Sequence, residues 1–372
     1  MISSPILVAE ALPGKKPSPI RPARFAAAVL WPPTITGIVP LVGRGREMHF
    51  SKSKKSSAKG LLAGPQRPHH GDVFVEALAP IVERHVERGE LLLADRRGRT
   101  PETAGAGAWR ETRLMTYSHL LVDRDGDIAT ITLNRPEKRN ALALDVMIEL
   151  TDALRDVGSS DALGVILAAS GPVFSAGHNF GDMAGADLDA ARHLFVVCTE
   201  MMDTVQALPQ PVVARVHALA TAAGCQLVAT CDLAVAAESA AFAIPGGKGG
   251  LFCHTPLVAV ARNVGRKRAL EMALTGDPID AATAAEWGLV NRVVPDSELD
   301  AAVADLVARA TRGSALSKAL GKRSFYAQVG LDQSDAYAVA MEEMATAAML
   351  DDAQEGFRAF LEKRHPIFTQ RA

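Results

Sequence analysis

The sequence predicts an α/β protein from about residue 116 to the C-terminus. Short apolar runs rich in β-branched residues alternate there with longer segments whose apolar residues recur at helical spacing. Small-residue turns follow the apolar runs and lead into the helical segments. This alternation is typical of the α/β class.

The first elements are a strand and a helix. Residues 128–133 place Ile, Thr and Thr on one side and Ala, Ile and Leu on the other, and the proline of Asn134-Arg-Pro136 ends the strand. Residues 144–157 are expected to form a helix, with apolar side chains at positions 146, 147, 150 and 154. The next strand is expected at 165–169.

A long helix follows at about 188–208 and ends before Pro209 and Pro211. Its apolar side is formed by Leu194, Val197, Met201, Val205 and Leu208. Strands are then expected at 212–216 and 233–236, with a helix between them that ends near Cys231. Everything after residue 255 is interpreted as helical, with breaks at Gly276-Asp-Pro278 and Gly288.

Residues 1–115 differ from the rest of the chain. Residues 1–70 contain eleven Lys and Arg against two acids, which leaves a net charge of −11 for the remainder of a chain of −2. They are rich in Pro and Ser and show no period, so we expect a disordered leader. An amphipathic helix is expected at 72–93 and a linker at 98–108.

Three interpretations of this leader stay open. Phe25–Gly43 is a run of 19 residues without a charge, but three prolines within it make a membrane span improbable. The basic, acid-poor composition fits an organelle transit peptide. The third interpretation is an upstream extension of a reading frame that begins at Met115.

The composition of the whole chain excludes some classes of function. A net charge of −2 argues against a nucleic-acid-binding protein that works by bulk electrostatics. Four cysteines in 372 residues, with no Cys-x-x-Cys pair, argue against a disulfide scaffold and a structural zinc site. No metal is therefore expected.

Two small-residue turns, Ala176–Asn179 and Ala222–Gln226, are the candidate ligand site. Each follows an apolar segment and leads into a helical one, so its backbone N–H groups are available to a carbonyl oxygen or an anion. The sequence around these turns resembles the crotonase superfamily, the enoyl-CoA hydratase and isomerase fold. The matching segments, in order, are Thr132-Leu-Asn-Arg-Pro136, Lys138-Arg-Asn-Ala-Leu142, Phe174-Ser-Ala-Gly-His-Asn179, Ala222-Ala-Gly-Cys-Gln226, Cys231-Asp232, Phe242–Pro245, Leu274-Thr-Gly276, Ala284–Val294 and Phe360-Leu-Glu-Lys-Arg364.

The resemblance implies a crotonase-like ββα spiral core at 116–310 and a C-terminal helical trimerisation region at 311–372, assembled as homotrimers or hexamers. It implies an acyl-CoA ligand of fatty-acid metabolism whose thioester oxygen accepts two backbone N–H groups. By position these donors are His178 and Ala223. Such an oxyanion hole stabilises an enolate-like transition state. The compartment implied is the cytoplasm in a bacterium or the mitochondrial matrix in a eukaryote.

The resemblance also implies where coenzyme A lies. The backbone near Ala141 and the side chains of Lys138 and Arg139 are expected beside its phosphates, although ordinary solvated charge explains both side chains equally well. Phe360 and Lys363 of the last helix are expected beside the nucleotide. The small residues of the two turns, Ala176, Gly177 and Gly224, are expected to line the ligand. No separate cofactor is implied, because coenzyme A enters as part of the substrate.

Two positions depart from the family pattern. A hydratase of this family uses two glutamates as base and acid, and the corresponding residues here are Gln226 and Gly246. No Asp or Glu lies between Glu238 and Glu271, so hydration is expected to be poor. We expect hydration to require Gln226→Glu together with Gly246→Glu, unless residue 246 needs a positive φ.

Other side chains are weaker candidates for proton transfer. The His178 ring titrates near neutrality, and Asp182 lies one helical turn further on, where a first-turn acid also favours the helix dipole. Cys253 and His254 complete the set, with a buried small hydrophobe as the alternative role for the cysteine. Two rival functions stay open: another acyl-CoA enzyme on this fold, such as a thioesterase, decarboxylase or isomerase, or a non-catalytic scaffold that binds coenzyme A.

Overall fold

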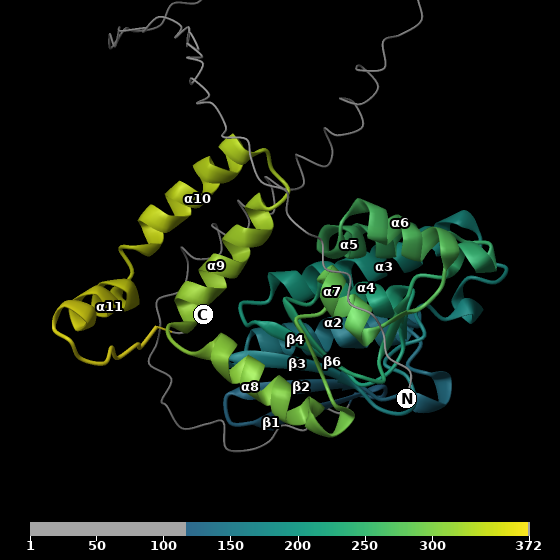
Figure 1. Cartoon of the computed structure of the whole chain (residues 1–372), viewed down its shortest axis with the longest axis horizontal. Helices are drawn as coiled ribbons and strands as arrows, with labels where there is room; N and C mark the ends of the chain where they lie inside the picture. The colour runs from purple at the N-terminus through teal and green to yellow at the C-terminus, as the bar shows by residue number, and fades with distance from the viewer. Residues whose placement is uncertain (1–116, 371–372) are drawn as a thin grey trace, which may run out of the picture. The chain divides into compact units, whose positions relative to one another are not determined.

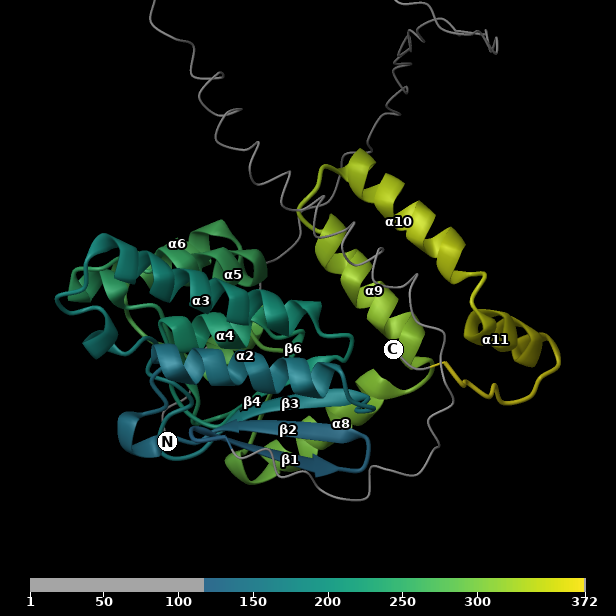
Figure 2. The same cartoon turned by 180° about the vertical axis from the view of Figure 1, so that it is seen from behind.

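The computed structural model describes residues 117–370, shown from opposite sides in Figures 1 and 2. The predictions made for the leader, including the helix at 72–93, therefore lie outside the described residues. Among the helices of residues 117–370, none is long and apolar enough to cross a membrane.

A six-stranded sheet lies at the centre of the described residues (Figure 1). In spatial order its strands are β1 (Leu120–Asp125), β2 (Ile128–Leu133), β3 (Gly164–Ala169), β4 (Val212–Val216), β6 (Leu233–Ala237) and β9 (Arg292–Val294). β1 is antiparallel to β2 and the later pairs are parallel, so that Ile131 lies beside Leu167 and Leu167 beside Ala214. A second sheet is formed by β5 (Ala220–Thr221), β7 (Ala241–Ala243) and β8 (Ile279–Asp280).

Helices cover both faces of the large sheet (Figure 2). One face carries α2 (Leu144–Gly158), α3 (Leu188–Ala207) and α4 (Ala223–Thr230), and the other carries α8 (Leu299–Thr311). The remaining helices are α5 (His254–Val264), α6 (Arg266–Thr275), α7 (Ala281–Trp287), α9 (Ala315–Gln328), α10 (Gln333–Ala347) and α11 (Asp351–Leu361). Short 3₁₀ turns lie at η2 (Pro136–Lys138), η3 (Phe180–Asp182), η4 (Gly246–Gly249) and η5 (Asp296–Glu298).

Alternating strand residues divide the core into two clusters. Val213 and Val235 pack with Leu299 and Val303 of α8, whereas Val212 joins the larger cluster under α2, α3 and α4. The apolar positions predicted for α2 and α3 are all buried: Val146, Met147, Leu150, Leu154, Leu194, Val197, Met201, Val205 and Leu208. The expected α/β class, its strands at 128–133, 165–169, 212–216 and 233–236 and the helices between them are confirmed.

The expectation that only helices follow residue 255 is wrong. β8 and β9 lie in that region and pair with β7 and β6. These strands have two and three residues, and none of the three in β9 is fully buried. Strands this short show no alternation in the sequence, because their position is set by the neighbouring strand rather than by their own side chains.

A partly buried polar cluster fastens α9 to the core beside the C-terminal end of α4. The Lys322 ammonium lies 2.6 Å from Asp232 Oδ2 and donates to the carbonyl oxygens of Val205 and Gln210, each at 3.0 Å. Tyr326 donates to Asp232 Oδ1 at 2.8 Å. All three ammonium protons therefore have acceptors, which offsets the cost of burying the charge.

The turn into α4 holds a non-glycine residue in an unusual conformation. Ala222 has φ +52° and ψ −120°, a region that glycine prefers. Its N–H donates to Ala243 O at 2.8 Å and its carbonyl oxygen accepts the Gln226 N–H at 3.0 Å, so the backbone is fixed on both sides. Backbone of this kind costs about 1–3 kcal/mol and persists only where the surroundings impose it.

Ala222→Gly is expected to raise the free energy of unfolding by about 1 kcal/mol, because removing the β-carbon relieves the positive φ. For a domain of this size the melting temperature should rise by about 2–4 °C. The matched control is Ala229→Gly in α4, which should lower the free energy of unfolding by about 1 kcal/mol, since its helical backbone gains nothing from glycine. A loss of stability in both variants, measured by chemical denaturation, would contradict the assignment of strain.

Candidate functional site

The two predicted turns lie side by side in the structure. The segment after β3 runs along the segment that leads into α4: Phe174 N–H donates to Leu219 O at 2.9 Å, and Thr221 N–H donates to Ser175 O at 3.0 Å. Ser175 and Ala220 form an isolated parallel bridge. The sequence motifs around 176–179 and 222–226 thus meet at one place.

Close contact between the turns depends on the missing side chain of Gly177. A β-carbon added there would lie 2.8 Å from Ala222 Cβ and 3.1 Å from the backbone nitrogen of Ala223, both too close. Gly177 also has φ +81°. A larger residue at this position would therefore push the turn at 176–179 away from the start of α4.

The backbone N–H groups of His178 and Ala223 lie at this junction and have no acceptor within residues 117–370, and the same holds for Gly224 and Cys225 in the first turn of α4. The parallel bridge between His178 and Leu142 explains why the His178 N–H has no acceptor. In it Leu142 N–H donates to Gly177 O at 2.8 Å and Asn179 N–H donates to Leu142 O at 3.4 Å, so the N–H of His178 points the other way. Ala223 is the first residue of α4, where an N–H has no partner within the helix. Both N–H groups lie where an oxygen atom of a ligand can accept a hydrogen bond from each of them.

The His178 side chain lies in apolar surroundings. Its ring meets the Phe195 ring edge-on, with 5.5 Å between the centroids. Neither ring nitrogen makes a hydrogen bond of good geometry in the described part of the chain, although the Leu142 carbonyl lies close to the ring. Burial lowers the pKa of His178, while the Leu142 carbonyl and the Asp182 carboxylate act in the opposite direction. Burial thus favours the neutral form of the ring, in which one nitrogen donates and the other accepts.

Gln226 lies one turn of α4 after Ala223 and is 6% exposed. Its side-chain oxygen Oε1 is buried, and no described residue donates to it. Side chains of a helix lean toward its N-terminus, so this amide lies over the turn that carries the free N–H of Ala223. An amide can hold a ligand or a water but cannot transfer a proton.

Gly246 opens η4, directly after Pro245. Its φ is not positive, so the positive φ considered from the sequence as an obstacle to a side chain does not occur. The obstacle is steric: an added β-carbon would collide with the Leu251 carbonyl oxygen and lie 2.7 Å from Cys253 Sγ. Cys253 Sγ accepts the Gly246 N–H at 3.2 Å, which closes this turn. A carboxylate cannot be introduced at 246 on the present backbone.

Asp182 has a structural task in the loop. Its Oδ2 accepts the N–H of Leu144, the first residue of α2, at 3.0 Å, and its Oδ1 accepts Asn179 Nδ2 at 3.0 Å. The carboxylate thus stabilises the N-terminus of α2. The sequence had led us to expect that it stabilises the N-terminus of its own helical turn. Among the weaker candidates, Cys253 is buried and His254 is exposed. Burial raises the pKa of the Cys253 thiol, which disfavours the thiolate.

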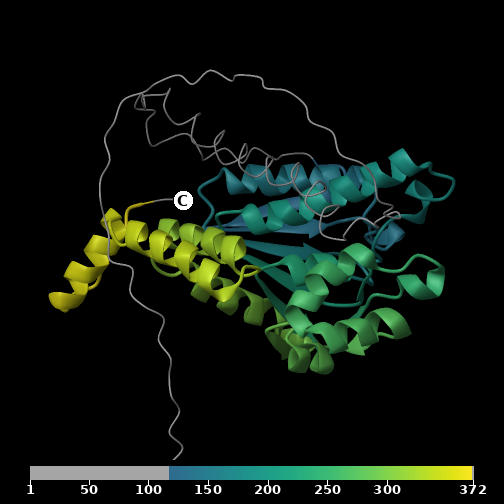
Figure 3. The ribbon, with the colours of Figure 1, turned by 90° about the horizontal axis from the view of Figure 1, so that it is seen from above.

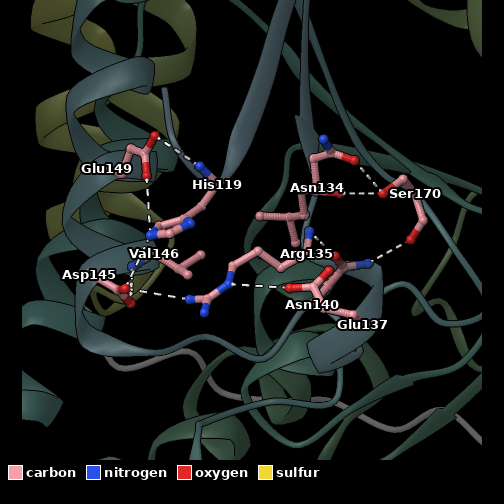
Figure 4. A network of polar contacts seen from close by, with 10 residues as sticks. His119, Asn134, Arg135, Glu137, Asn140, Asp145, Val146, Glu149 and Ser170 are labelled. Atoms are coloured by element: carbon pink, nitrogen blue, oxygen red, sulfur yellow. Dashed lines mark hydrogen bonds and ion pairs between the residues drawn. The ribbon is translucent and has the colours of Figure 1, made fainter. Parts of the chain in front are cut away.

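The loop proposed for the phosphates is held by Asn140 (Figure 4). Asn140 is 1% exposed. Its side chain accepts the Arg135 N–H at 2.9 Å and donates to Ser170 O at 2.7 Å and Val173 O at 3.0 Å. It has φ +48°, which asparagine tolerates better than most residues. Asn140 was not among the residues expected at the site from the sequence, although an asparagine in a turn is a signal for such a role.

The side chains of Lys138 and Arg139 point outward from this loop and are exposed. The loop is joined to the turn at 176–179, since Ala176 N–H donates to Arg139 O at 3.0 Å. The structure thus brings Lys138, Arg139, Ala141, Ala176 and Gly177 together beside the free N–H groups. Gly224 follows Ala223 at the same junction.

Phe360 and Lys363 do not join this cluster within one chain. Figures 1 and 3 show α11 beyond α9 and α10, away from α3 and α4. Phe360 is 82% exposed.

A cavity of about 380 Å³ lies elsewhere, between α9 and the ends of the strands. Asp232, Lys322 and Tyr326 line it, together with Pro209 and Phe325. It borders the C-terminal end of α4, whereas the free N–H of Ala223 is at the N-terminal end. The candidate site is therefore defined by its donors rather than by this cavity.

Comparison with known proteins places the chain and its fold in a family. The family described as enoyl-CoA hydratase/isomerase matches residues 123–371. The mitochondrial enoyl-CoA hydratase domain-containing protein 3 of Rattus norvegicus is 44% identical over 266 residues, which cover 71% of this chain and 87% of the rat protein. The human protein of the same name is 42% identical over 272 residues, covering 72% of this chain and 88% of the human one.

Solved structures agree with these relatives. The crystal structure of an enoyl-CoA hydratase from Mycobacterium smegmatis matches with a TM-score of 0.66 and 46% identity, and covers 68% of this chain and 99% of its own. Human enoyl-CoA hydratase domain-containing protein 3 matches with a TM-score of 0.65 and 40% identity, covering 67% of this chain and all of its own. The crotonase fold expected from the sequence is thereby confirmed, and the chain belongs to the enoyl-CoA hydratase/isomerase family.

Proposed function

We propose that this protein binds an acyl-CoA thioester and polarises its carbonyl oxygen between the N–H groups of His178 and Ala223. The observation that carries the proposal is the pair of unused donors on two touching segments. An acyl-CoA ligand is the one that the family implies. Two donors that are already fixed in place stabilise negative charge on the oxygen, and losing one such donor typically costs about 10²–10³ in rate.

Coenzyme A is proposed to lie along the loop at 138–141, with its phosphates near Lys138 and Arg139. Ala176 is proposed to lie beside the pantetheine arm, while Gly177 and Gly224 shape the site indirectly, because the space beside each of them is filled by the facing segment of the protein. Phe360 and Lys363 are proposed to reach coenzyme A from the α11 of a neighbouring copy, because α11 lies apart from this loop within one chain (Figure 3).

The neighbouring copy is part of the proposal. α9, α10 and α11 expose many apolar side chains: Phe325, Val329, Tyr337, Met341, Met344, Phe357, Phe360 and Leu361. Such an apolar surface marks an interaction site. We therefore propose a homotrimer, or two trimers paired as a hexamer, with the C-terminal region at 311–372 as the interface.

The full chain is expected to elute with the mass of three or six copies in size-exclusion chromatography with light scattering. Met341→Asp with Met344→Asp on α10 should reduce that mass, because charge in an apolar interface is strongly disfavoured. The control is Ala304→Asp with Ala308→Asp on the exposed face of α8, which changes the charge equally and should leave the mass unchanged. A monomer at micromolar concentration would overturn the proposed assembly.

Hydration is proposed to be slow, because Gln226 and Gly246 stand where the family places two proton-transferring glutamates. The protein would then serve fatty-acid metabolism through another acyl-CoA reaction or as a subunit that binds coenzyme A. Asp182 is the weaker candidate for such a reaction, since both of its oxygens already accept hydrogen bonds. The neutral ring of His178 is the stronger one.

Acyl-CoA should bind and raise the melting temperature of the protein. Lys138→Glu with Arg139→Glu should weaken binding about tenfold or more in calorimetry, since two charge-assisted phosphate contacts are lost. The matched control is Arg266→Glu with Lys267→Glu on α6, an exposed basic pair whose reversal changes the net charge equally. Equal weakening in both double variants would mean that only bulk charge attracts coenzyme A.

Crotonyl-CoA should be hydrated at least about 10⁴-fold more slowly than by a relative that keeps both glutamates, because each general acid or base contributes about 10²–10⁴. The loss of enoyl-thioester absorbance measures this rate. Gln226→Glu alone should restore little of it, since the second proton still has no carrier. Fast hydration by the unmutated protein would refute the proposal and direct the search to the His178 ring.

A further inference from the structure

The side chain of Ser175 contacts the segments of both free donors. It is fully buried. Its hydroxyl donates to the Asn140 carbonyl oxygen at 2.8 Å and accepts the N–H of Gly177 at 3.2 Å. Gly177 directly precedes His178, so this hydroxyl fixes the backbone from which the His178 N–H projects.

The other side of Ser175 faces the start of α4. A β-carbon added to Gly224 would lie 2.7 Å from Ser175 Cβ and 2.9 Å from Ser175 Oγ. The backbone of Ser175 is tied to the same segment, because its carbonyl oxygen accepts the Thr221 N–H at 3.0 Å. Because Gly224 has no side chain, the start of α4 with Ala223 can lie directly against Ser175.

The hydroxyl of Ser175 is not free to act as a nucleophile. It has a single proton, which the Asn140 carbonyl accepts, and the side chain has no exposed surface. A substrate therefore cannot reach it. Its effect on a ligand must pass through the positions of Gly177 and Ala223.

We propose that Ser175 is a positioning residue that sets the separation and direction of the His178 and Ala223 N–H groups. This inference rests on the proposed function. The hydroxyl bridges the loop at 138–141 and the turn at 176–179, while its small volume lets α4 approach. Removing the hydroxyl leaves the Gly177 N–H and the Asn140 carbonyl without partners, and the turn can shift by the few tenths of an ångström to which hydrogen bonds to a carbonyl are sensitive.

The test uses sorboyl-CoA, a conjugated dienoyl thioester whose absorbance moves to longer wavelength when its carbonyl oxygen is polarised. The full-length protein should bind it and produce this shift. Ser175→Ala should bind free coenzyme A as the unmutated protein does, but bind sorboyl-CoA about tenfold more weakly, the equivalent of about one hydrogen bond. It should also lose at least half of the spectral shift.

Ser170→Ala is the matched control. Ser170 Oγ donates to Asn134 Oδ1 at 2.9 Å and lies 3.2 Å from Leu133 O, so this variant loses comparable hydrogen bonds away from the two donors (Figure 4). It should keep the full shift. Ser175→Cys keeps the shape of the side chain with a slightly larger and weaker donor, and should give an intermediate shift if Ser175→Ala fails to fold.

The outcomes separate the two proposals. A full shift in Ser175→Ala, or in Ser175→Cys and Ser170→Ala alike, would show that Ser175 is only a buried structural residue. No shift in the unmutated protein, despite tight binding of free coenzyme A, would overturn the oxyanion hole itself. No binding of either ligand would overturn the proposed function.

Discussion

The hydrogen bonds of one buried hydroxyl hold the candidate site together. Three segments that are far apart in the sequence meet at Ser175: the loop before α2, the turn after β3 and the turn into α4. Each leaves the sheet at the end of a strand or enters a helix, so none is fixed by regular secondary structure at that point. The hydroxyl bonds act together with the backbone bonds of Phe174 and Thr221, so the two free N–H groups are aligned before a ligand binds and the entropic cost of binding is lower.

Long elements were predictable from the sequence because their own side chains determine them. The helix at 188–207 has its buried side at residues 194, 197, 201 and 205. The strand at 212–216 is a mostly apolar run that begins directly after a proline. β1 was not assigned, since Asp123, Arg124 and Asp125 give it the composition of a loop. β1 is an edge strand with one neighbour, so these charged side chains stay in water while the backbone pairs with β2.

The site was predictable in part. The order of short motifs identified the two turns, and the helix start at Ala223 gave the reason for free donors there. The closed surroundings of Gly246 could not be read from the sequence, because the carbonyl that blocks it belongs to Leu251, in a turn without periodic pattern. The distance of Phe360 from the loop at 138–141 likewise depends on how α9 and α10 leave the core, and no local pattern encodes that.

α4 has only eight residues, about 12 Å of helix, and every one of them is buried. Its first residue carries a free N–H donor of the candidate site. Asp232, two residues past its end, forms an ion pair with Lys322 of α9. One buried helix therefore has the contact to α9 beside its C-terminal end and a ligand donor at its N-terminal end. The position of the C-terminal helices and the direction of the Ala223 N–H are thus defined relative to the same short element.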